Sequence, residues 1–306
     1  MNQLTTQTAA LPAHLADSIE QAKELIAARH STATRLAYDS DLKAFNAWTR
    51  TNGLASLPAS IEAVVLFLAE LSGQGMKPAS IARKVAAIKF AHRQANLPSP
   101  TDSEPVKATM AGIKRTRGTA PRQVSPATVE VIEQLLAACD DSKAGFRDKA
   151  LIALGFAAAL RRSELAAIEL KDIQVSERGL VITLPRSKTD QEGKGQTVAV
   201  LDGSRLQVKR LLGDWLEVSG ITEGLVFPLT GRHIANIIKA KAKAAGLNPE
   251  LFSGHSLRAG FITSAANAGA DIFRVMDVSR HRSMNTVRGY VRRAKQFDNH
   301  AGAAFM

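Results

Sequence analysis

Apolar residues recur at helical spacing through most of the first third of the chain. The segments between them carry residues that start or end helices: Ser31 can cap the second segment, Gly53 closes it, and Pro78 stands at the start of the fourth. The pattern predicts helices at Asp17 to Ala28, Thr32 to Thr51, Ser60 to Ser72, Pro78 to Ala95 and, more weakly, Asp102 to Arg115. The first third is therefore expected to be all-helical.

The pattern changes in the second half of the chain. Helical spacing predicts helices at Pro126 to Ala138, Phe146 to Leu160 and Ser163 to Ile168, and again at Ser204 to Val218, Arg232 to Ala245, Ser256 to Ala268, Ile272 to Val278 and Met284 to Val291. Between these groups, Leu180 to Pro185 and Thr197 to Leu201 are rich in β-forming residues, with a polar, glycine-containing stretch between them. This arrangement predicts a small antiparallel sheet with a loose loop in a mainly α protein.

A chain of 306 residues is long for one domain. Residues 1–16 are rich in Thr, Ala and Gln without an amphipathic period, and we expect a flexible leader. Residues 117–125 carry Gly118 and Pro121 without apolar periodicity, which is typical of a linker. We therefore expect a helical domain at 17–116 and an α/β domain at 126–306 that ends in a tail helix.

Composition restricts the partner and the compartment. The excess of 40 Lys and Arg over 28 Asp and Glu gives a net charge of +12, which points to a polyanion, either nucleic acid or an anionic membrane. The longest apolar stretch, near Leu151 to Leu160, is too short to span a bilayer, and the N-terminus does not have a basic region followed by an apolar run. A single cysteine, Cys139, excludes an internal disulfide and fits a reducing compartment. We expect a cytoplasmic protein without a membrane partner.

Two stretches, the second of which runs from Lys107 into the linker, carry cations and no acidic residue. They hold Lys77, Arg83, Lys84, Lys89 and Arg93 in the first, and Lys107, Lys114, Arg115, Arg117 and Arg122 in the second. One such stretch alone is typical of a solvated helix face. Two of them in a strongly basic chain favour a surface that neutralises DNA phosphates.

Metal and nucleotide sites have no recognisable motif here. His, Cys, Asp and Glu do not show ligand spacing, and the phosphate-binding pattern GxxxxGK[ST] is missing. We therefore expect no metal and no cofactor. Any phosphoryl transfer must take its charge stabilisation from side chains.

The C-terminal half holds, in this order, Ala159-Leu160-Arg161-Arg162-Ser163-Glu164-Leu165, Arg186-Ser187-Lys188-Thr189, Gly254-His255-Ser256-Leu257-Arg258-Ala259-Gly260, His281 and Tyr290. The order resembles the tyrosine recombinase (phage integrase) family, with R-x-S-E-L, a hairpin lysine, H-x-L-R, a late His or Trp, and a tyrosine nine residues after it. Trp48, the run HRQANLPSPTDS, SGHS and GYVR resemble the Cre branch. The likeness covers the chain from about Thr32 onward.

This resemblance implies a helical core DNA-binding domain, an α/β catalytic domain, and a site-specific recombinase acting through a 3′-phosphotyrosyl intermediate. Attack by the Tyr290 hydroxyl builds negative charge on the phosphate oxygens, which the guanidiniums of Arg161 and Arg258 can bind in pairs. The phosphotyrosyl bond keeps the energy of the broken link, so rejoining needs neither ATP nor metal.

The remaining motif residues support the same step. Lys188 can donate the proton to the departing 5′ oxygen. By resemblance, His255 helps to accept the Tyr290 proton and His281 supports a non-bridging oxygen. Glu164 is expected to hold an arginine or histidine in position.

The other tyrosine, Tyr38, is a weaker candidate nucleophile. It shares a helix side with Arg35, Leu42 and Phe45, so core packing or a DNA contact suits it better than catalysis.

The chain departs from the family at two positions where glycine is common. Ala159 stands before the Leu-Arg of the first motif, and Ser279-Arg280 precedes His281 where the family often has Leu-Gly. The first change is mild. The second puts a bulky cation beside His281, which leaves the placement of that histidine open.

Base recognition is expected from helices in the major groove, where Arg reads guanine and Asn or Gln reads adenine. The candidates are Thr32, Arg35, Arg83, Lys84, Lys89, Arg93, Arg232 and Asn236. By resemblance, Arg232 is the strongest of them, with His233 beside it able to share the role. The partner is expected to be double-stranded DNA with inverted-repeat half-sites in a bacterial, phage or plasmid context.

The tail carries Phe297, Phe305 and Met306 on a stretch too short to be a stable helix alone. It can pack on its own domain or, by resemblance, dock on a neighbouring protomer, giving a monomer in solution and a tetramer on DNA.

Two alternative functions stay open. A type IB topoisomerase-like relaxer would use the same residues as a monomer. A catalytically silent DNA-binding protein on this scaffold would not need the full set of Arg161, Lys188, His255, Arg258 and Tyr290, which argues against it.

Overall fold

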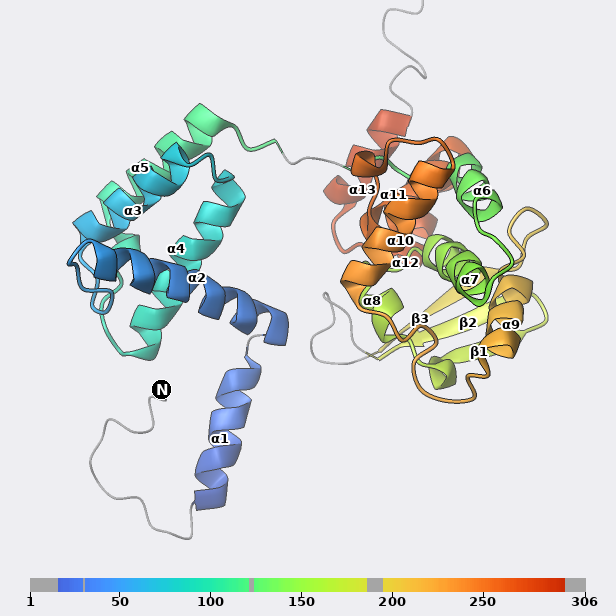
Figure 1. Ribbon diagram of the computed structural model, residues 1–306, viewed down its shortest axis with the longest axis horizontal. Coiled ribbons are helices and arrows are strands. Elements are labelled where there is room, and N and C mark those ends of the chain that lie inside the picture. Colours follow the sequence, from blue (N-terminus) through green and yellow to red (C-terminus); the bar gives the residue numbers. More distant parts are fainter. Residues whose placement is uncertain (1–15, 30, 121–123, 186–194, 295–306) are drawn as a thin grey trace, which may run out of the picture. The chain divides into compact units, whose positions relative to one another are not determined.

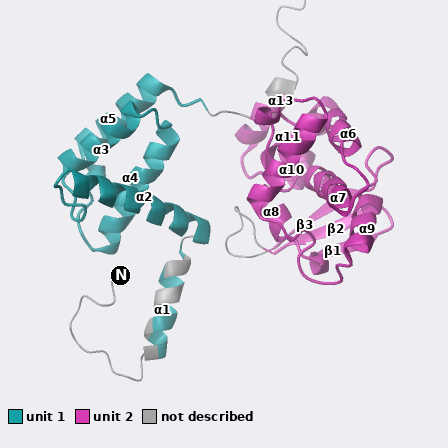
Figure 2. Cartoon of the chain, viewed as in Figure 1, with its two compact units in different colours: residues 1–121 teal, residues 122–306 magenta. Residues whose placement is uncertain are grey.

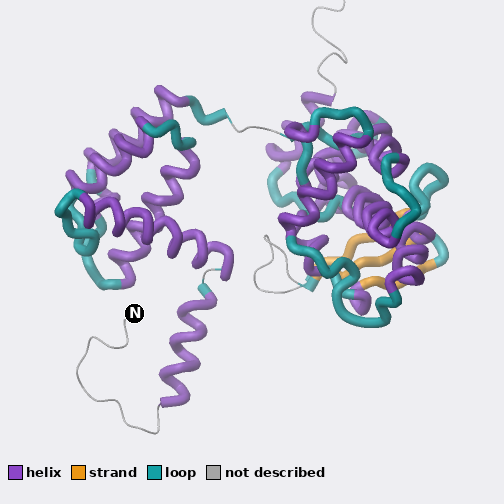
Figure 3. Tube along the Cα trace, viewed as in Figure 1, coloured by secondary structure: helices purple, strands orange, loops and turns teal. Residues whose placement is uncertain are grey.

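The computed structural model describes residues 16–29, 31–120, 124–185 and 195–294. The chain forms two compact units, residues 1–121 and 122–306 (Figure 2). Each unit contains its own cluster of buried apolar side chains. Helices dominate both units, and the strands found in the described ranges lie in the second (Figure 3). Among these residues, no helix combines the length and the apolar character that a bilayer crossing needs.

Unit 1 is helical, as the sequence predicts. Its helices are α1 (Ala16–Ala28), α2 (Thr32–Thr51), α3 (Ile61–Gly73), α4 (Pro78–Gln94) and α5 (Glu104–Arg117), with a 3₁₀ turn at Pro100–Asp102 (Figure 1). The predicted ends agree within two residues. The capping signals explain this accuracy, because Ser31 accepts from the Thr34 N–H and Pro78 occupies the first turn of α4.

The core of unit 1 lies among α2, α3, α4 and α5. Phe45 and Phe67 pack in a tilted pair with ring centroids 5.0 Å apart. His92 is fully buried there, and both ring nitrogens have partners: Nε2 accepts from the Ala59 N–H and Nδ1 donates to the Ile88 carbonyl, each at 2.9 Å. His92 is thus a satisfied core histidine.

Unit 2 combines helices with a small sheet. Its helices are α6 (Val129–Ala137), α7 (Lys143–Ala157), α8 (Arg162–Ala167), α9 (Val208–Ser219), α10 (Gly231–Ala244), α11 (Gly254–Asn267), α12 (Ile272–Ser279) and α13 (Met284–Ala294). Short 3₁₀ turns lie at Leu170–Asp172 and Pro249–Leu251. Helix α7 begins three residues before the predicted Phe146, because Ser142 caps it by accepting from the Gly145 N–H at 3.1 Å.

The sheet of unit 2 is antiparallel. In the described part of the chain its strands are β1 (Ile173–Ser176), β2 (Gly179–Leu184) and β3 (Gln196–Leu201), in the order β1-β2-β3. The sequence prediction did not include β1. Along β2 and β3 the register places Leu180 opposite Val200 and Ile182 opposite Val198, and all four side chains are buried. This face joins the apolar cluster that includes α7 and α9, which Figure 1 draws next to the sheet.

Helix α11 is held tightly against its neighbours. A Cβ at Gly260 would stand 1.7 Å from the Ala127 carbonyl oxygen, so glycine is required for this approach. The same segment is fixed by a hydrogen bond from the Ala127 N–H to the Ser256 carbonyl at 2.9 Å. Because α11 carries two of the motif residues, its packing gives them a rigid support.

Candidate active site

The turn between α7 and α8 places the first cation of the site. Ala159 has a positive φ of 46°, and Arg161 follows as the N-cap of α8. The Arg161 backbone N–H donates to Glu164 Oε2 at 2.8 Å, and its Nη1 donates to Oε1 at 2.7 Å. Glu164 therefore caps the helix and also holds the Arg161 side chain.

The second cation, Arg258, comes from α11 and is 1% exposed. Its Nη1 donates to the Ala159 carbonyl at 2.7 Å, and its Nη2 lies 3.2 Å from His281 Nδ1. A buried charge needs such partners to be tolerated. Since Ala159 belongs to the turn before Arg161, its carbonyl ties the two arginine-bearing segments together.

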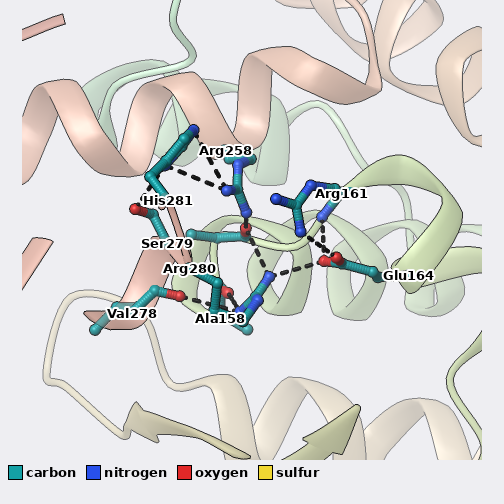
Figure 4. Close-up of polar contacts among 9 residues, drawn as sticks. Ala158, Arg161, Glu164, Arg258, Val278, Ser279, Arg280 and His281 are labelled. Carbon is teal, nitrogen blue, oxygen red and sulfur yellow. Dashed lines mark hydrogen bonds and ion pairs between the residues drawn. The ribbon is translucent and has the colours of Figure 1, made fainter. Parts of the chain in front are cut away.

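A third guanidinium, from Arg280, completes the cluster (Figure 4). Arg280 ends α12 in the left-handed conformation, with φ 55° and ψ 41°. Its Nη2 donates to Glu164 Oε2 at 2.7 Å and to the Ala159 carbonyl at 3.2 Å. Its Nη1 donates to the carbonyls of Ala158 at 3.2 Å and Val278 at 3.0 Å. The side chain thus points into the interior of unit 2.

The left-handed turn at Arg280 determines the position of His281. Because the Arg280 side chain turns inward, His281 reaches Arg258, whose Nη2 lies 3.2 Å from Nδ1 and 3.4 Å from Nε2. Ser279 Oγ lies 2.8 Å from Nδ1. Arginine can only donate, so the ring nitrogen that accepts from Arg258 carries no proton.

The candidate nucleophile, Tyr290, lies on α13. Val287 of the same helix is buried against Ile262 of α11 and Val275 of α12, and Tyr290 packs at the edge of this cluster. The Tyr290 hydroxyl lies 3.2 Å from Nε2 of His255, the second residue of α11. This distance permits direct proton transfer between hydroxyl and imidazole.

The electrostatics of the cluster keep both histidines neutral. Burial, with the charges of Arg258 and Arg161, lowers the pKa of His281 to about 4. Partial desolvation, again with Arg258 and Arg161, lowers the pKa of His255 below its usual value. At neutral pH, His255 is therefore in the form that accepts a proton.

Glu164 and Arg258 stay charged. Burial alone would raise the pKa of Glu164, but Arg280 and Arg161 outweigh it and lower this pKa. Burial and the neighbouring guanidiniums lower the pKa of Arg258 to about 9, which leaves it cationic at pH 7. Among the described residues of this cluster the cations outnumber the single carboxylate, so the site favours an anion such as a phosphodiester.

The structure brings most of the predicted catalytic residues together. The cluster contains Arg161, Glu164, His255, Arg258, His281 and Tyr290. Lys188 and the tail residues Phe297, Phe305 and Met306 lie outside the described residues, so the roles predicted for them stay predictions. No group of three or more potential metal-ligating side chains occurs within the described ranges.

Two DNA-contact candidates on α4 share a buried carboxylate. Asp41, on α2, accepts from Arg83 Nε at 2.7 Å and from Lys84 Nζ at 3.0 Å. The Arg83 side chain keeps 53% of its surface exposed. The expectation for Lys84 needs correction, because this residue is buried and its ammonium is an internal partner of Asp41. Lys84 does not lie on the exposed face of α4.

The other candidates on the first unit lie at its surface. Thr32 and Arg35 are exposed in the first turn of α2, where Arg35 Nη2 lies 3.5 Å from Thr32 Oγ1. Lys89 pairs with Asp102, and Arg93 is exposed at the end of α4.

In unit 2, Arg232 and Asn236 are exposed on α10, and their four-residue spacing puts them on one helix face. Thr230 caps this helix by accepting from the His233 N–H at 3.3 Å.

Two residues of the cluster were not among the predicted site residues. Arg280 is the ion-pair partner of Glu164, and Ser279 contacts the His281 ring. The available signal was the bulky arginine at a position where glycine is common. The sequence could not indicate that Arg280 pairs with Glu164, because the two residues lie far apart along the chain.

Family matches cover both units. Residues 127–296 match the phage integrase family, and residues 22–95 match its N-terminal SAM-like domain. An integrase/recombinase XerD homologue of Selenomonas ruminantium is 35% identical over 286 residues, covering 88% of this chain and 84% of the relative. Recombinase Cre of Escherichia phage P1 is 25% identical over 293 residues, covering 85% and 83%.

Solved structures show the same fold. XerH recombinase in a post-cleavage complex with its palindromic difH substrate has a TM-score of 0.62 at 21% identity, covering 80% of this chain and 72% of that one. A lambda integrase dimer bound to a core site has a TM-score of 0.60 at 17% identity, covering 89% and 93%.

The low pKa of His281 gives a direct test of the cluster. We expect its ring to stay neutral from pH 7.5 to pH 5.5 and to gain a proton near pH 4, because burial and the guanidiniums disfavour the cation. Ring ¹⁵N chemical shifts of the DNA-free protein measure this, with a His281→Asn variant to assign the signal. Titration near the unperturbed value of about 6.5 would contradict the geometry.

Proposed function

The chain belongs to the phage integrase family of tyrosine recombinases and is a site-specific DNA strand-transferring enzyme, and we propose that it cleaves DNA by forming a covalent bond from Tyr290 to a 3′-phosphate. The observation that carries this proposal is the Tyr290 hydroxyl 3.2 Å from His255 Nε2, with the Arg258 guanidinium close enough to interact electrostatically with both residues. Nucleophile, proton acceptor and charge stabilisers are thus adjacent.

In the proposed cleavage step, Tyr290 Oη attacks the phosphorus and its proton passes to the neutral imidazole of His255. The new P–O bond to Tyr290 forms as the bond to the 5′ oxygen of the next nucleotide breaks. We propose that Lys188 gives the leaving oxygen its proton, so that a free 5′-hydroxyl results. Rejoining reverses these steps with a 5′-hydroxyl as the nucleophile, and the phosphotyrosyl bond conserves the energy.

Charge stabilisation is assigned to arginine and histidine. The Arg161 and Arg258 guanidiniums bind the non-bridging oxygens as negative charge develops, with His281 supporting one of them. The fixed contacts of these groups support this role: Arg258 is anchored on the Ala159 carbonyl and Arg161 on Glu164. Donors held in advance need little reorganisation when the reaction occurs.

We propose that DNA half-sites are read by exposed residues of both units. Arg232 and Asn236 on α10 have the side chains that match guanine and adenine in the major groove. In unit 1, Arg93 and Arg35 offer exposed cations, and Thr32, Lys89 and Arg83 are the further candidates. Lys84 has no part in this set, because it is buried on Asp41.

We further propose that a homo-tetramer acts on two DNA sites made of inverted-repeat half-sites, and that the tail residues Phe297, Phe305 and Met306 dock on a neighbouring protomer. The apolar residues of that short segment support this proposal.

Sedimentation of Tyr290→Phe protein with a duplex carrying two half-sites measures the stoichiometry. Four protomers with two duplexes are expected. A complex that stops at single protomers on separate half-sites would contradict the tetramer and favour a topoisomerase-like relaxer.

Removal of the Tyr290 hydroxyl separates binding from chemistry. We expect Tyr290→Phe to bind DNA as the wild type does and to form no covalent adduct, because only the attacking oxygen is lost. The half-site is first selected from random-sequence duplexes with this variant. Denaturing gels then follow adduct formation on a nicked suicide duplex in EDTA, without nucleotide.

The wild-type protein and a Tyr38→Phe variant are the controls in this assay. Both should form the adduct, and Arg258→Ala should form it at least about 100-fold more slowly, the usual loss for a preorganised donor. An adduct that persists in Tyr290→Phe would reject the assigned nucleophile. A wild-type protein that binds the selected duplex but never forms an adduct would favour a silent DNA-binding protein.

A further inference from the structure

Arg280 occupies a position where its backbone would suit glycine. Its φ of 55° and ψ of 41° lie in the left-handed region, which side chains with a Cβ rarely adopt. Its side chain is also 3% exposed, and its buried Nε has no hydrogen-bond partner among the described residues, although burial of a guanidinium is unfavourable unless its donors are paired. A residue with two such costs persists only where the surrounding structure compensates for them.

The compensation comes from Glu164 and from carbonyls around the site. Arg280 Nη2 donates to Glu164 Oε2 at 2.7 Å, and its two amino groups reach the carbonyls of Ala158, Ala159 and Val278 at 3.0 to 3.2 Å. Arg280 thereby connects the end of α12 to the turn before Arg161.

Glu164 is divided between two arginines as a result. Its Oε1 accepts from Arg161 Nη1, whereas its Oε2 accepts from Arg280 Nη2 and from the Arg161 backbone. Because Oε2 is occupied in this way, the Arg161 side chain bonds to Glu164 through Nη1 alone. Its other N–H donors are then available to bind a phosphate. Without Arg280, the carboxylate can draw both arms of Arg161 in a bidentate pair.

Arg280 also affects the orientation of His281, the next residue in the chain. The inward Arg280 side chain and the left-handed turn direct the imidazole to Arg258 Nη2. The Ala159 carbonyl accepts from both Arg258 and Arg280, so these two guanidiniums share one anchor.

We propose that Arg280 is a positioning residue for DNA cleavage: by occupying one oxygen of Glu164 and anchoring the turn before His281, it keeps Arg161 and His281 oriented to the scissile phosphate. This inference rests on the proposed function. It assigns a role to an arginine that stands where the family often has glycine.

A pH signature follows from the charges around Glu164. Arg161 from α8 and Arg280 from the end of α12 both bond to this carboxylate, and Arg258 of α11 interacts with it electrostatically. Burial raises the pKa of Glu164, and Arg280 is first among the groups that lower it. Loss of Arg280 therefore raises the pKa of Glu164. In a variant without Arg280, cleavage should be lost as the pH falls below this raised pKa and Glu164 takes up a proton, and cleavage should recover at higher pH.

We expect Arg280→Gly to bind the selected half-site within about twofold of the wild type and to form the adduct at least about 10-fold more slowly at saturating protein, since small displacements of reacting groups are costly. The loss should deepen between pH 8 and pH 5.5. Arg280→Lys keeps the cation, so its pH profile should follow the wild type, with an intermediate rate. Arg178→Gly, which removes an exposed arginine in the β1–β2 turn, is the charge-matched control.

Carboxyl ¹³C titration of Glu164 in the DNA-free protein gives a measurement that does not depend on cleavage. A higher pKa in Arg280→Gly than in the wild type is expected. If the glycine variant unfolds, Arg280→Met, which keeps the aliphatic stem, replaces it in both assays.

Two results would overturn the proposal. One is a folded Arg280→Gly protein with the rate and pH profile of the wild type. The other is equal slowing in the Gly and Lys variants with an unchanged pH profile and an unchanged Glu164 pKa, which would make Arg280 a packing residue only. A wild-type protein that forms no adduct would instead reject the proposed function and leave the Glu164 titration as the test of the ion pair.

Discussion

One buried carboxylate organises the candidate active site. Glu164 lies among guanidiniums, with Arg161 on one oxygen and Arg280 on the other. Several buried cations would repel one another without such a partner, and removing one member of a buried ion pair usually destabilises a protein strongly. The carbonyl of Ala159 supplies the second anchor, for Arg258 and Arg280. The guanidiniums that we propose to bind the phosphate are therefore held in place by negatively charged oxygen atoms.

The backbone makes this arrangement possible at two left-handed residues. Ala159 and Arg280 both have positive φ, and they are also the positions at which this chain departs from the glycines common in the family. The turn at Ala159 aims a carbonyl at the arginines, and the turn at Arg280 sends one side chain inward and the next to Arg258. Rigid support comes from α11, whose close packing on Ala127 requires Gly260. Tyr290 lies on a separate helix, so the proposed nucleophile and the proposed charge stabilisers are carried by different elements.

Local signals in the sequence accounted for much of the fold. Ser31 and Pro78 mark helix starts that the structure confirms, and the β-rich runs became β2 and β3. Strand β1 was missed because Ile173–Ser176 is short and mostly exposed, so its pairing with β2 leaves little trace in the apolar pattern.

For the candidate site, the order and internal spacing of the sequence motifs indicated which residues form the cluster. Lys84 could not be judged from the sequence, since its partner Asp41 lies on another helix. The same reason concealed the pairing of Arg280 with Glu164.

In the proposed mechanism, Tyr290 carries the DNA during strand exchange. Protease digestion of the covalent adduct, followed by nuclease trimming and tandem mass spectrometry, identifies the linked residue directly. We predict one modified peptide, from α13, with a nucleotide joined through a 3′-phosphate to Tyr290 Oη. A nucleotide on Tyr38, on a serine, or attached through a 5′-phosphate would contradict it.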